Sequence, residues 1–297
     1  MKSFKIFYLS IIGMMFFTAC EKEISPPAQN GNQIVVSCFI SAADANIQAT
    51  VRLSKPHYGI VYGGRASEIS NAEVIISNTK GGRLMLTWDN STKIYTVPAG
   101  NFLQVGQTYN LKVSLPGKES VTAQTTIPEE ITNFDVNVFS KKLVADNSYE
   151  RRGQDFKCYQ TDLIFKSTTP SRYNHFYVKA EFFNSADGIP RSRKETPTFS
   201  RSYFSQAVNG KLEESVVVVK KADMNQSQLS NYSKVEYTAY LTSASEDYYK
   251  HELTMAAVDK NAEGAFVSPV RVYSNIQGGY GIFAGHNTIT KRIVSTY

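Results

Sequence analysis

Hydrophobic and polar residues alternate in short segments along residues 33–128, and turn residues separate the segments. Such alternation is typical of strands that bury one face. About seven strands fall in roughly 95 residues, which is the pattern of an immunoglobulin-like β-sandwich. The predicted strands are Ile34–Ser41, Ile47–Ser54, Ala72–Asn78, Arg83–Trp88, Lys93–Val97, Thr108–Leu115 and Glu119–Ile127.

Two further features of this region bear on its fold and function. The segment 105–111, which contains Tyr109, resembles the tyrosine-corner entry to a late strand of immunoglobulin-like domains. Residues 55–71 form a long connection that carries Tyr58 and Tyr62. A loop of this length is either functional or merely mobile.

Residues 129–297 are expected to form a second antiparallel β domain. A polar loop is predicted from Lys141 to Gly153, and an irregular loop spans 184–201. Asn209-Gly210 predicts a hairpin turn, because both positions of such a turn favour positive φ. The expected strands are Phe134–Phe139, Asp155–Lys166, His175–Phe183, Ser202–Val208, Lys211–Val219 and Val235–Ser243.

One short helix is predicted near residues 245–258. Ser245 can cap its first turn, and Glu246 and Asp247 suit the positive end of the helix dipole. The helical spacing i, i+4, i+7 is met by Tyr249, Leu253 and Ala256.

The N-terminal residues 1–19 have the pattern of a signal peptide. Lys2 and Lys5 precede an apolar run from Ile6 to Phe17, which is too short to span a hydrocarbon core of about 30 Å. The ending Phe-Thr-Ala-Cys at 17–20 resembles the lipobox of bacterial lipoproteins. That resemblance implies acylation of Cys20 and a lipid anchor on a membrane, with residues 20–32 as an acylated tether.

Charge and cysteine content narrow the classes of function. The formal charge is +6, and removal of Lys2 and Lys5 with the signal peptide gives 6 − 2 = +4. This mild excess is spread over short groups, so no nucleic-acid partner is expected. Cys38 lies mid-strand on the apolar face, and Cys158 falls in the second domain, so we expect two separate buried thiols rather than a disulfide.

The most distinctive stretch is the glycine-rich segment 272–285. Its Ser-Asn-Ile at 274–276, its glycine pair at 278–279 and its Gly-Ile-Phe at 281–283 resemble the C-terminal hallmark of a family of Bacteroidota outer-membrane lipoproteins of unknown function. Members are often encoded beside TonB-dependent receptors. The resemblance therefore implies an accessory role in uptake or envelope assembly, and Glu21-Lys22-Glu23 resembles the signal that sends such lipoproteins to the cell surface.

The signature residues have two readings, a structural turn or a contact with a partner. We favour a turn that packs Tyr280, Ile282 and Phe283 into the second domain. A nucleotide-binding loop is disfavoured, because the flanks are β-like rather than strand and helix. The signature residues are Asn275, Gly278, Gly279, Gly281 and Gly285.

No catalytic set stands out. The four histidines show no paired zinc spacing, there is no G-x-S-x-G elbow, and no acidic run resembles a calcium loop. His251 is expected on a solvated helix face. We therefore expect no enzyme activity, no cofactor and no metal site.

Two classes of function remain. The first is a non-enzymatic accessory protein of a TonB-dependent transporter or another envelope complex, anchored in the outer membrane. The resemblance of residues 21–23 to an export signal adds display at the cell surface to this expectation. The second is a lipoprotein that binds a glycan or a peptide. The candidate contact residues on the long loops are Tyr58, Tyr62, Arg191, Arg193, Phe199 and Tyr203.

Overall fold

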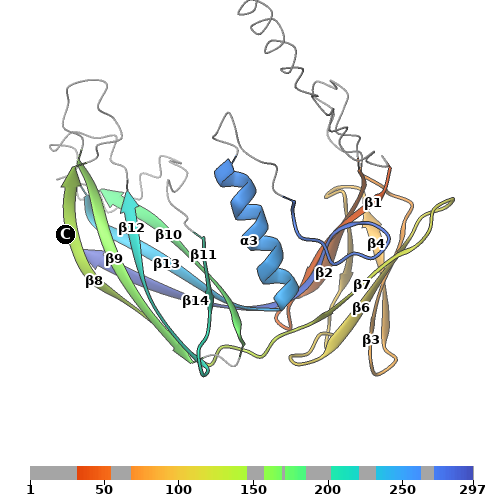
Figure 1. The fold of residues 1–297 in the computed structure, drawn as a ribbon, viewed down its shortest axis with the longest axis horizontal. Coiled ribbons are helices and arrows are strands. Elements are labelled where there is room, and N and C mark those ends of the chain that lie inside the picture. The colour runs from red at the N-terminus through yellow and green to blue at the C-terminus, as the bar shows by residue number, and fades with distance from the viewer. Residues whose placement is uncertain are drawn as a thin grey trace, which may run out of the picture.

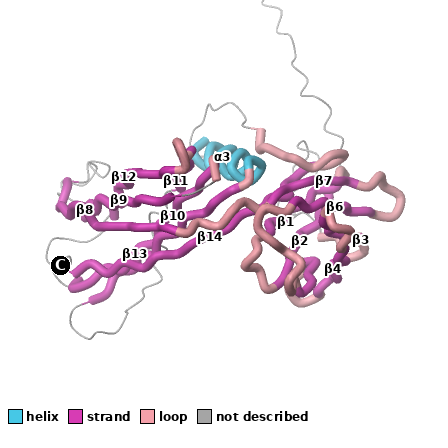
Figure 2. Tube along the Cα trace, turned by 90° about the horizontal axis from the view of Figure 1, so that it is seen from below, coloured by secondary structure: helices cyan, strands magenta, loops and turns pink. Residues whose placement is uncertain are grey.

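The computed structural model describes residues 32–54, 68–145, 157–168, 171–184, 202–220, 232–261 and 271–296. These residues fold into two β-rich units that lie side by side, and their one helix lies near the junction (Figures 1 and 2). The mainly β fold expected from the sequence is confirmed.

The N-terminal unit has the strand order of an immunoglobulin-like sandwich. Immunoglobulin sheets are ordered ABED and CFG. Here the chain order gives β1-β2-β5-β4 and β3-β6-β7, which are the same places, and a β3–β4 ladder joins the two halves. The strands are β1 (Ile34–Ile40), β2 (Asn46–Leu53), β3 (Glu73–Asn78), β4 (Arg83–Asp89), β5 (Ile94–Pro98), β6 (Thr108–Ser114) and β7 (Val121–Thr126).

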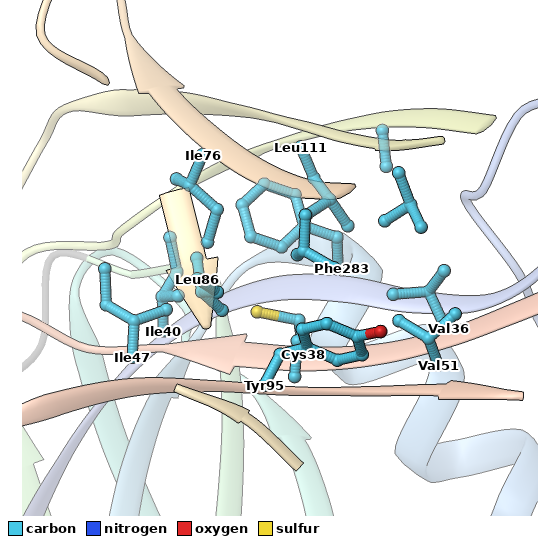
Figure 3. Close-up of a cluster of buried hydrophobic side chains, with 14 of the residues drawn as sticks. Val36, Cys38, Ile40, Ile47, Val51, Ile76, Leu86, Tyr95, Leu111 and Phe283 are labelled. Atoms are coloured by element: carbon cyan, nitrogen blue, oxygen red, sulfur yellow. The ribbon is translucent and has the colours of Figure 1, made fainter. Parts of the chain in front are cut away.

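The core of this unit lies between the two sheets. Strand β1 alternates buried and half-buried positions, and Val36, Cys38 and Ile40 belong to the cluster shown in Figure 3. Cys38 is a free cysteine, as predicted, and burial raises the pKa of its thiol to about 12. It therefore serves as a small apolar side chain. Cys158 lies in the second unit, but its side chain falls outside the described residues.

Tyr109 forms the predicted tyrosine corner. Its hydroxyl donates to the carbonyl oxygen of Phe102 at 2.9 Å and accepts from the backbone N–H of Gln104 at 2.7 Å. The ring is fully buried and packs against Phe102. The loop before β6 is thus fastened to the strand that follows it.

The second unit is also built from two sheets with a core between them. Strands β10, β11 and β13 belong to the same large sheet as the N-terminal unit, whereas β12, β9 and β8 form a separate three-stranded sheet. Phe165 of one sheet stacks on Phe176 of the other with ring centroids 3.9 Å apart. The strands are β8 (Asn133–Ala145), β9 (Lys157–Thr168), β10 (Tyr173–Asn184), β11 (Ser202–Gln206), β12 (Lys211–Lys220) and β13 (Tyr232–Ala244).

Strand β8 is longer than the sequence indicated. The predicted loop began at Lys141, but β8 continues to Ala145 and pairs through Lys141–Ala145 with Lys157–Thr161 of β9. The error arose because the polar composition of this stretch was taken as a sign of a loop. Ladder hydrogen bonds to a long neighbour hold the backbone extended despite that composition.

The Asn209-Gly210 turn is present, but it does not join a hairpin ladder. Both residues have positive φ, and Val208 and Lys211 exchange backbone hydrogen bonds of 3.1 and 3.0 Å. Beyond that bridge β11 pairs with β10, while β12 pairs with β9. The turn is therefore a corner that leads the chain from one sheet to the other, and the hairpin prediction is wrong.

The predicted helix is confirmed as α3 (Glu246–Asn261). The Ser245 hydroxyl accepts from the backbone N–H of Tyr248 at 3.2 Å, which caps the first turn. Lys250 and Glu246 pair at 2.7 Å one turn apart. Within the described chain, no helix combines the length and apolar character needed to cross a bilayer.

The last strand, β14 (Tyr280–Thr296), belongs to both units. Its first part runs parallel to β1, with Tyr280–Gly285 opposite Val35–Ile40. Its second part runs antiparallel to β13, with His286–Thr296 opposite Lys234–Ala244. Figure 1 shows β14 passing from the N-terminal unit, near α3, into the second unit. The sequence pattern predicts a turn here, and that prediction is wrong, because the residues form this strand.

Candidate functional site

Most of the residues predicted for lipidation or partner contact lie outside the described residues. They are Cys20, Tyr58, Tyr62, Arg191, Arg193 and Phe199. Tyr203 lies in β11 with its backbone opposite Phe176 of β10, but its side chain is also outside the described set. The glycine signature lies wholly within the described residues, and it forms the candidate site.

The signature segment, residues 275–285, lies between two edge strands of the N-terminal sandwich. On one side it forms the parallel ladder with β1. On the other side Gln277 and Thr122 of β7 exchange backbone hydrogen bonds of 2.8 and 3.2 Å. The N–H of Gly285 donates to Oγ1 of Thr125 at 2.9 Å. The segment therefore closes the side of the sandwich where β1 and β7 would otherwise leave unpaired edges.

Three glycines of the segment leave no room for a side chain. A Cβ atom placed on any of them would overlap a backbone carbonyl oxygen of β1 or β7, which no change of rotamer can relieve. Gly281 also has a φ of +109°, which L side chains rarely adopt. The Cβ-to-oxygen distances would be 2.4 Å from Ile34 for Gly279, 1.8 Å from Val36 for Gly281 and 2.4 Å from Thr126 for Gly285.

Two apolar side chains anchor the segment in the core of the N-terminal unit. Phe283 is fully buried and Ile276 is 6% exposed, and both belong to the first core cluster. In Figure 3, Phe283 lies beside Leu111 between the two sheets. The prediction that Phe283 packs into the second domain is therefore wrong, because the parallel ladder with β1 carries it into the first core instead.

Asn275 has a structural role within the segment. Its amide nitrogen donates to the carbonyl oxygen of Phe283 at 2.8 Å, and its amide oxygen accepts from the N–H of Phe283 at 3.0 Å. The side-chain amide thus makes the two hydrogen bonds that the backbone of a neighbouring strand would otherwise make to Phe283. This pair of bonds folds the start of the segment against β14.

A cluster of aromatic rings and histidines lies where α3 meets the sheet. The Tyr248 ring stacks on His286 of β14, with centroids 5.5 Å apart, and meets Phe39 of β1 edge-on at 5.6 Å. His175 of β10 lies 3.3 Å from the Tyr248 hydroxyl and stacks on Phe204 of β11 at 4.7 Å. Tyr248 thus contacts strands of both units. Sequence reasoning missed this cluster, since its members are far apart in the chain.

Burial sets the protonation state of the cluster. It lowers the pKa of His175 to about 4 and also lowers the pKa of His286, although Asp44 nearby acts in the opposite direction on His286. Nε2 of His175 and Nδ1 of His286 are buried without a hydrogen-bond partner. At neutral pH both rings are therefore uncharged packing elements.

The residues directly before the signature segment are held against the helix by Tyr273. Its hydroxyl donates to Oδ1 of Asp247 at 2.6 Å, and its backbone N–H donates to Oγ1 of Thr254 at 2.9 Å. Its carbonyl oxygen lies 2.9 Å from Nδ1 of His251, whose ring is also 6.1 Å from Phe39. The expectation that His251 occupies a solvated face is therefore wrong.

The groups of this site contact an extended backbone. In the described ranges, no three His, Cys, Asp or Glu side chains gather closely enough to hold an ion. The groups that converge on the segment are backbone amides, carbonyl oxygens and apolar side chains. Such an arrangement docks an extended strand and fixes two units to one another.

Replacing individual glycines with alanine should show how much stability depends on positive φ and how much on the close approach of neighbouring backbone. Gly117 has a φ of +74° and open space around it. Gly281 has positive φ, and a Cβ there would also overlap backbone atoms. At Gly285 only the overlap applies, because its φ is ordinary. We expect Gly117→Ala to lower the free energy of unfolding by about 1–2 kcal/mol. Gly281→Ala and Gly285→Ala should each cost several kcal/mol more, because backbone atoms must move.

Urea denaturation monitored by circular dichroism measures these costs, with Gly117→Ala as the matched control. If the three variants lost equal stability, close approach of the strands would not be the reason for the glycines.

The stability of the protein should fall in mild acid through His175. Its folded pKa of about 4 lies below the ordinary histidine value of 6.5, so between these values the unfolded chain binds a proton that the folded chain does not. The free energy of unfolding therefore falls as the pH drops from 6.5 towards 4, by roughly 1.4 kcal/mol per pH unit at most. His175→Phe should flatten this slope.

Urea titrations at a series of pH values measure the slope. Tyr248→Phe is the control, because it removes the hydroxyl contact but leaves His175 buried, and it should keep the wild-type slope. Equal slopes for wild type and His175→Phe would contradict the assignment.

Comparison with known proteins gives a family for the chain. No curated protein matches it. The sequence model of one family matches residues 21–292, which cover both β units, α3 and most of β14. The chain therefore belongs to the family described as a domain of unknown function, DUF4249.

Proposed function

We propose that the protein is an outer-membrane lipoprotein that acts as a non-enzymatic accessory or interaction protein of a TonB-dependent transporter or another envelope complex. The observation that carries the proposal is the Phe-Thr-Ala-Cys ending of the apolar N-terminal segment. Two or more acyl chains on Cys20 would hold the protein stably on a membrane, since each buried methylene contributes about 0.8 kcal/mol.

The arrangement of polar groups supports an interaction role over catalysis. The three described histidines lie against aromatic rings between helix and sheet. The Asp247 carboxylate accepts a hydrogen bond from Tyr273, and the buried Asn287 bonds to the Ser41 hydroxyl at 2.9 Å. These groups hold segments together, and that use favours a rigid body that presents surfaces to a partner.

The resemblance of residues 274–283 to envelope lipoproteins found beside TonB-dependent receptors supports the choice of partner. The tether at 20–32 is rich in proline and small polar residues, which would let the folded part reach a neighbour in the same membrane.

A second candidate function, glycan binding, is favoured by one observation. On the outer face of the second unit, Tyr177 and Tyr240 lie with ring centroids 5.7 Å apart. The Lys179 ammonium lies 5.8 and 5.4 Å from the two centroids. Partly exposed tyrosine rings beside a cation suit stacking and hydrogen bonding with a sugar.

The anchor is tested by replacing its acceptor. Cys20→Ala should abolish labelling by an alkynyl fatty acid and should release the protein from the membrane fraction, because no other residue is placed for acylation. Cys38→Ala is the matched control and should keep both labelling and membrane association. Persistent labelling of Cys20→Ala would refute the lipoprotein assignment.

The partner is tested by pull-down from crosslinked membranes of the native host. We expect a TonB-dependent receptor in near-stoichiometric amount, and we expect a variant with residues 185–200 shortened to lose it without a change in melting temperature. Gly281→Ala is the comparison variant. If it remained folded and lost the partner, the signature itself would be the contact. Recovery of no transporter, together with a glycan-array signal that Tyr177→Ala abolishes, would favour the second candidate.

A further inference from the structure

Aromatic and cationic side chains lie together on the outer face of the second unit. Along β10, Phe176 and Val178 belong to the second core, so the alternate positions of this strand occupy the opposite face. Tyr177 and Lys179 lie on that face, and the ladder with β13 places Tyr240 directly opposite Tyr177. The two tyrosines are half-buried and Lys179 is exposed, so solvent reaches all three side chains.

The positive charge of Lys179 is not neutralised on this face. Its ammonium lies 5.8 and 5.4 Å from the ring centroids of Tyr177 and Tyr240, within the range of a cation–π contact. Among the side chains that the structure describes, no carboxylate pairs with it. Arg292 of β14, two strands away in the same row, is paired with Glu236. An anion that approaches this face is therefore attracted mainly to Lys179.

The neighbouring side chains suit a sugar. Thr290 of β14 continues the row of the two tyrosines, and Thr238 of β13 lies beside Lys179 in the next row. Tyrosine rings offer apolar faces for stacking, and hydroxyl groups both donate and accept hydrogen bonds. A saccharide with an acidic group uses the rings, the hydroxyl groups and the cation together, whereas a simple anion uses only the cation.

We infer that Tyr177, Tyr240 and Lys179 bind a saccharide that carries an anionic group, either a carboxylate or a sulfate. The anionic group meets the Lys179 ammonium, and a sugar ring stacks on the tyrosine pair. This inference rests on the second candidate function, glycan binding, and adds the charge that the ligand must carry. A neutral glycan of the same size should bind this face more weakly.

The test compares matched acidic and neutral probes by biolayer interferometry on the full-length protein. Oligogalacturonate is paired with its methyl ester, which has the same sugar without the charge, and dextran sulfate is paired with dextran. We expect the acidic member of at least one pair to bind at least about fivefold more tightly, because hydrogen bonds to charged groups are the stronger ones. Added salt should reduce this difference by screening the charges.

Substitutions of Lys179 locate the binding. Lys179→Gln removes the charge and should weaken binding of the acidic probe by about fivefold or more, whereas Lys179→Arg keeps the charge and should retain most of the binding. Lys112→Gln is the matched control, because Lys112 is an exposed lysine on β6 of the other unit and its loss changes the net charge equally. It should bind like wild type. Equal weakening by Lys179→Gln and Lys112→Gln would overturn the inference.

The other outcomes separate this inference from glycan binding in general. Equal binding of acidic and neutral probes, lost in Tyr177→Ala, would support glycan binding but overturn the acidic ligand. Binding of polyglutamate as tightly as the acidic sugars would overturn the choice of a saccharide, because charge alone would then explain it. If no probe bound, the inference would be wrong, whereas the second candidate function would still be decided by the glycan array.

Discussion

The close approach of β14 to β1 is the constraint on which the rest of the structure depends. Opposite Val36, the β14 backbone comes so near that only glycine fits. This contact sets the register of the parallel ladder, and the ladder places Phe283 in the first core. Because β14 continues without a break into the antiparallel ladder with β13, the same contact also fixes where the second unit begins.

The residues at the crossing between the units reinforce this geometry. Asn287 follows the parallel ladder by two residues, donates its amide to the carbonyl oxygen of Pro128, and bonds to Ser41 at the end of β1. Above the same point, Tyr248 of α3 contacts Phe39 from one unit and His175 from the other. A rotation of one unit against the other would break polar and aromatic contacts together. The contacts at this junction therefore oppose such a rotation.

The sequence was most informative where structure is decided locally. Alternation found every strand of the N-terminal unit, since those strands bury one face, and the Ser245 cap located α3. The Asn209-Gly210 turn was also correct, but no local signal says that β11 and β12 pair with different neighbours. Strand β14 was not predicted, because glycines favour a turn unless the partner strand β1 is known. Strand β1 is more than 200 residues away in the sequence. The glycine spacing of residues 280–285 is therefore explained only by their pairing with Val35–Ile40.

The signature segment packs against the sandwich, so functional groups are expected on other surfaces of the molecule. Gly279, Gly281 and Gly285 are required because a side chain there would meet backbone atoms, and Phe283 is buried, so these groups are not offered to a ligand in solution. A motif can therefore be the most distinctive stretch of a chain and still describe assembly rather than chemistry. The surfaces that remain for recognition are those that the signature holds in place, among them the face that carries Tyr177, Lys179 and Tyr240. A change at the glycines would alter such surfaces only by displacing the units that carry them, whereas a change at Tyr177 would alter the proposed sugar-binding face directly.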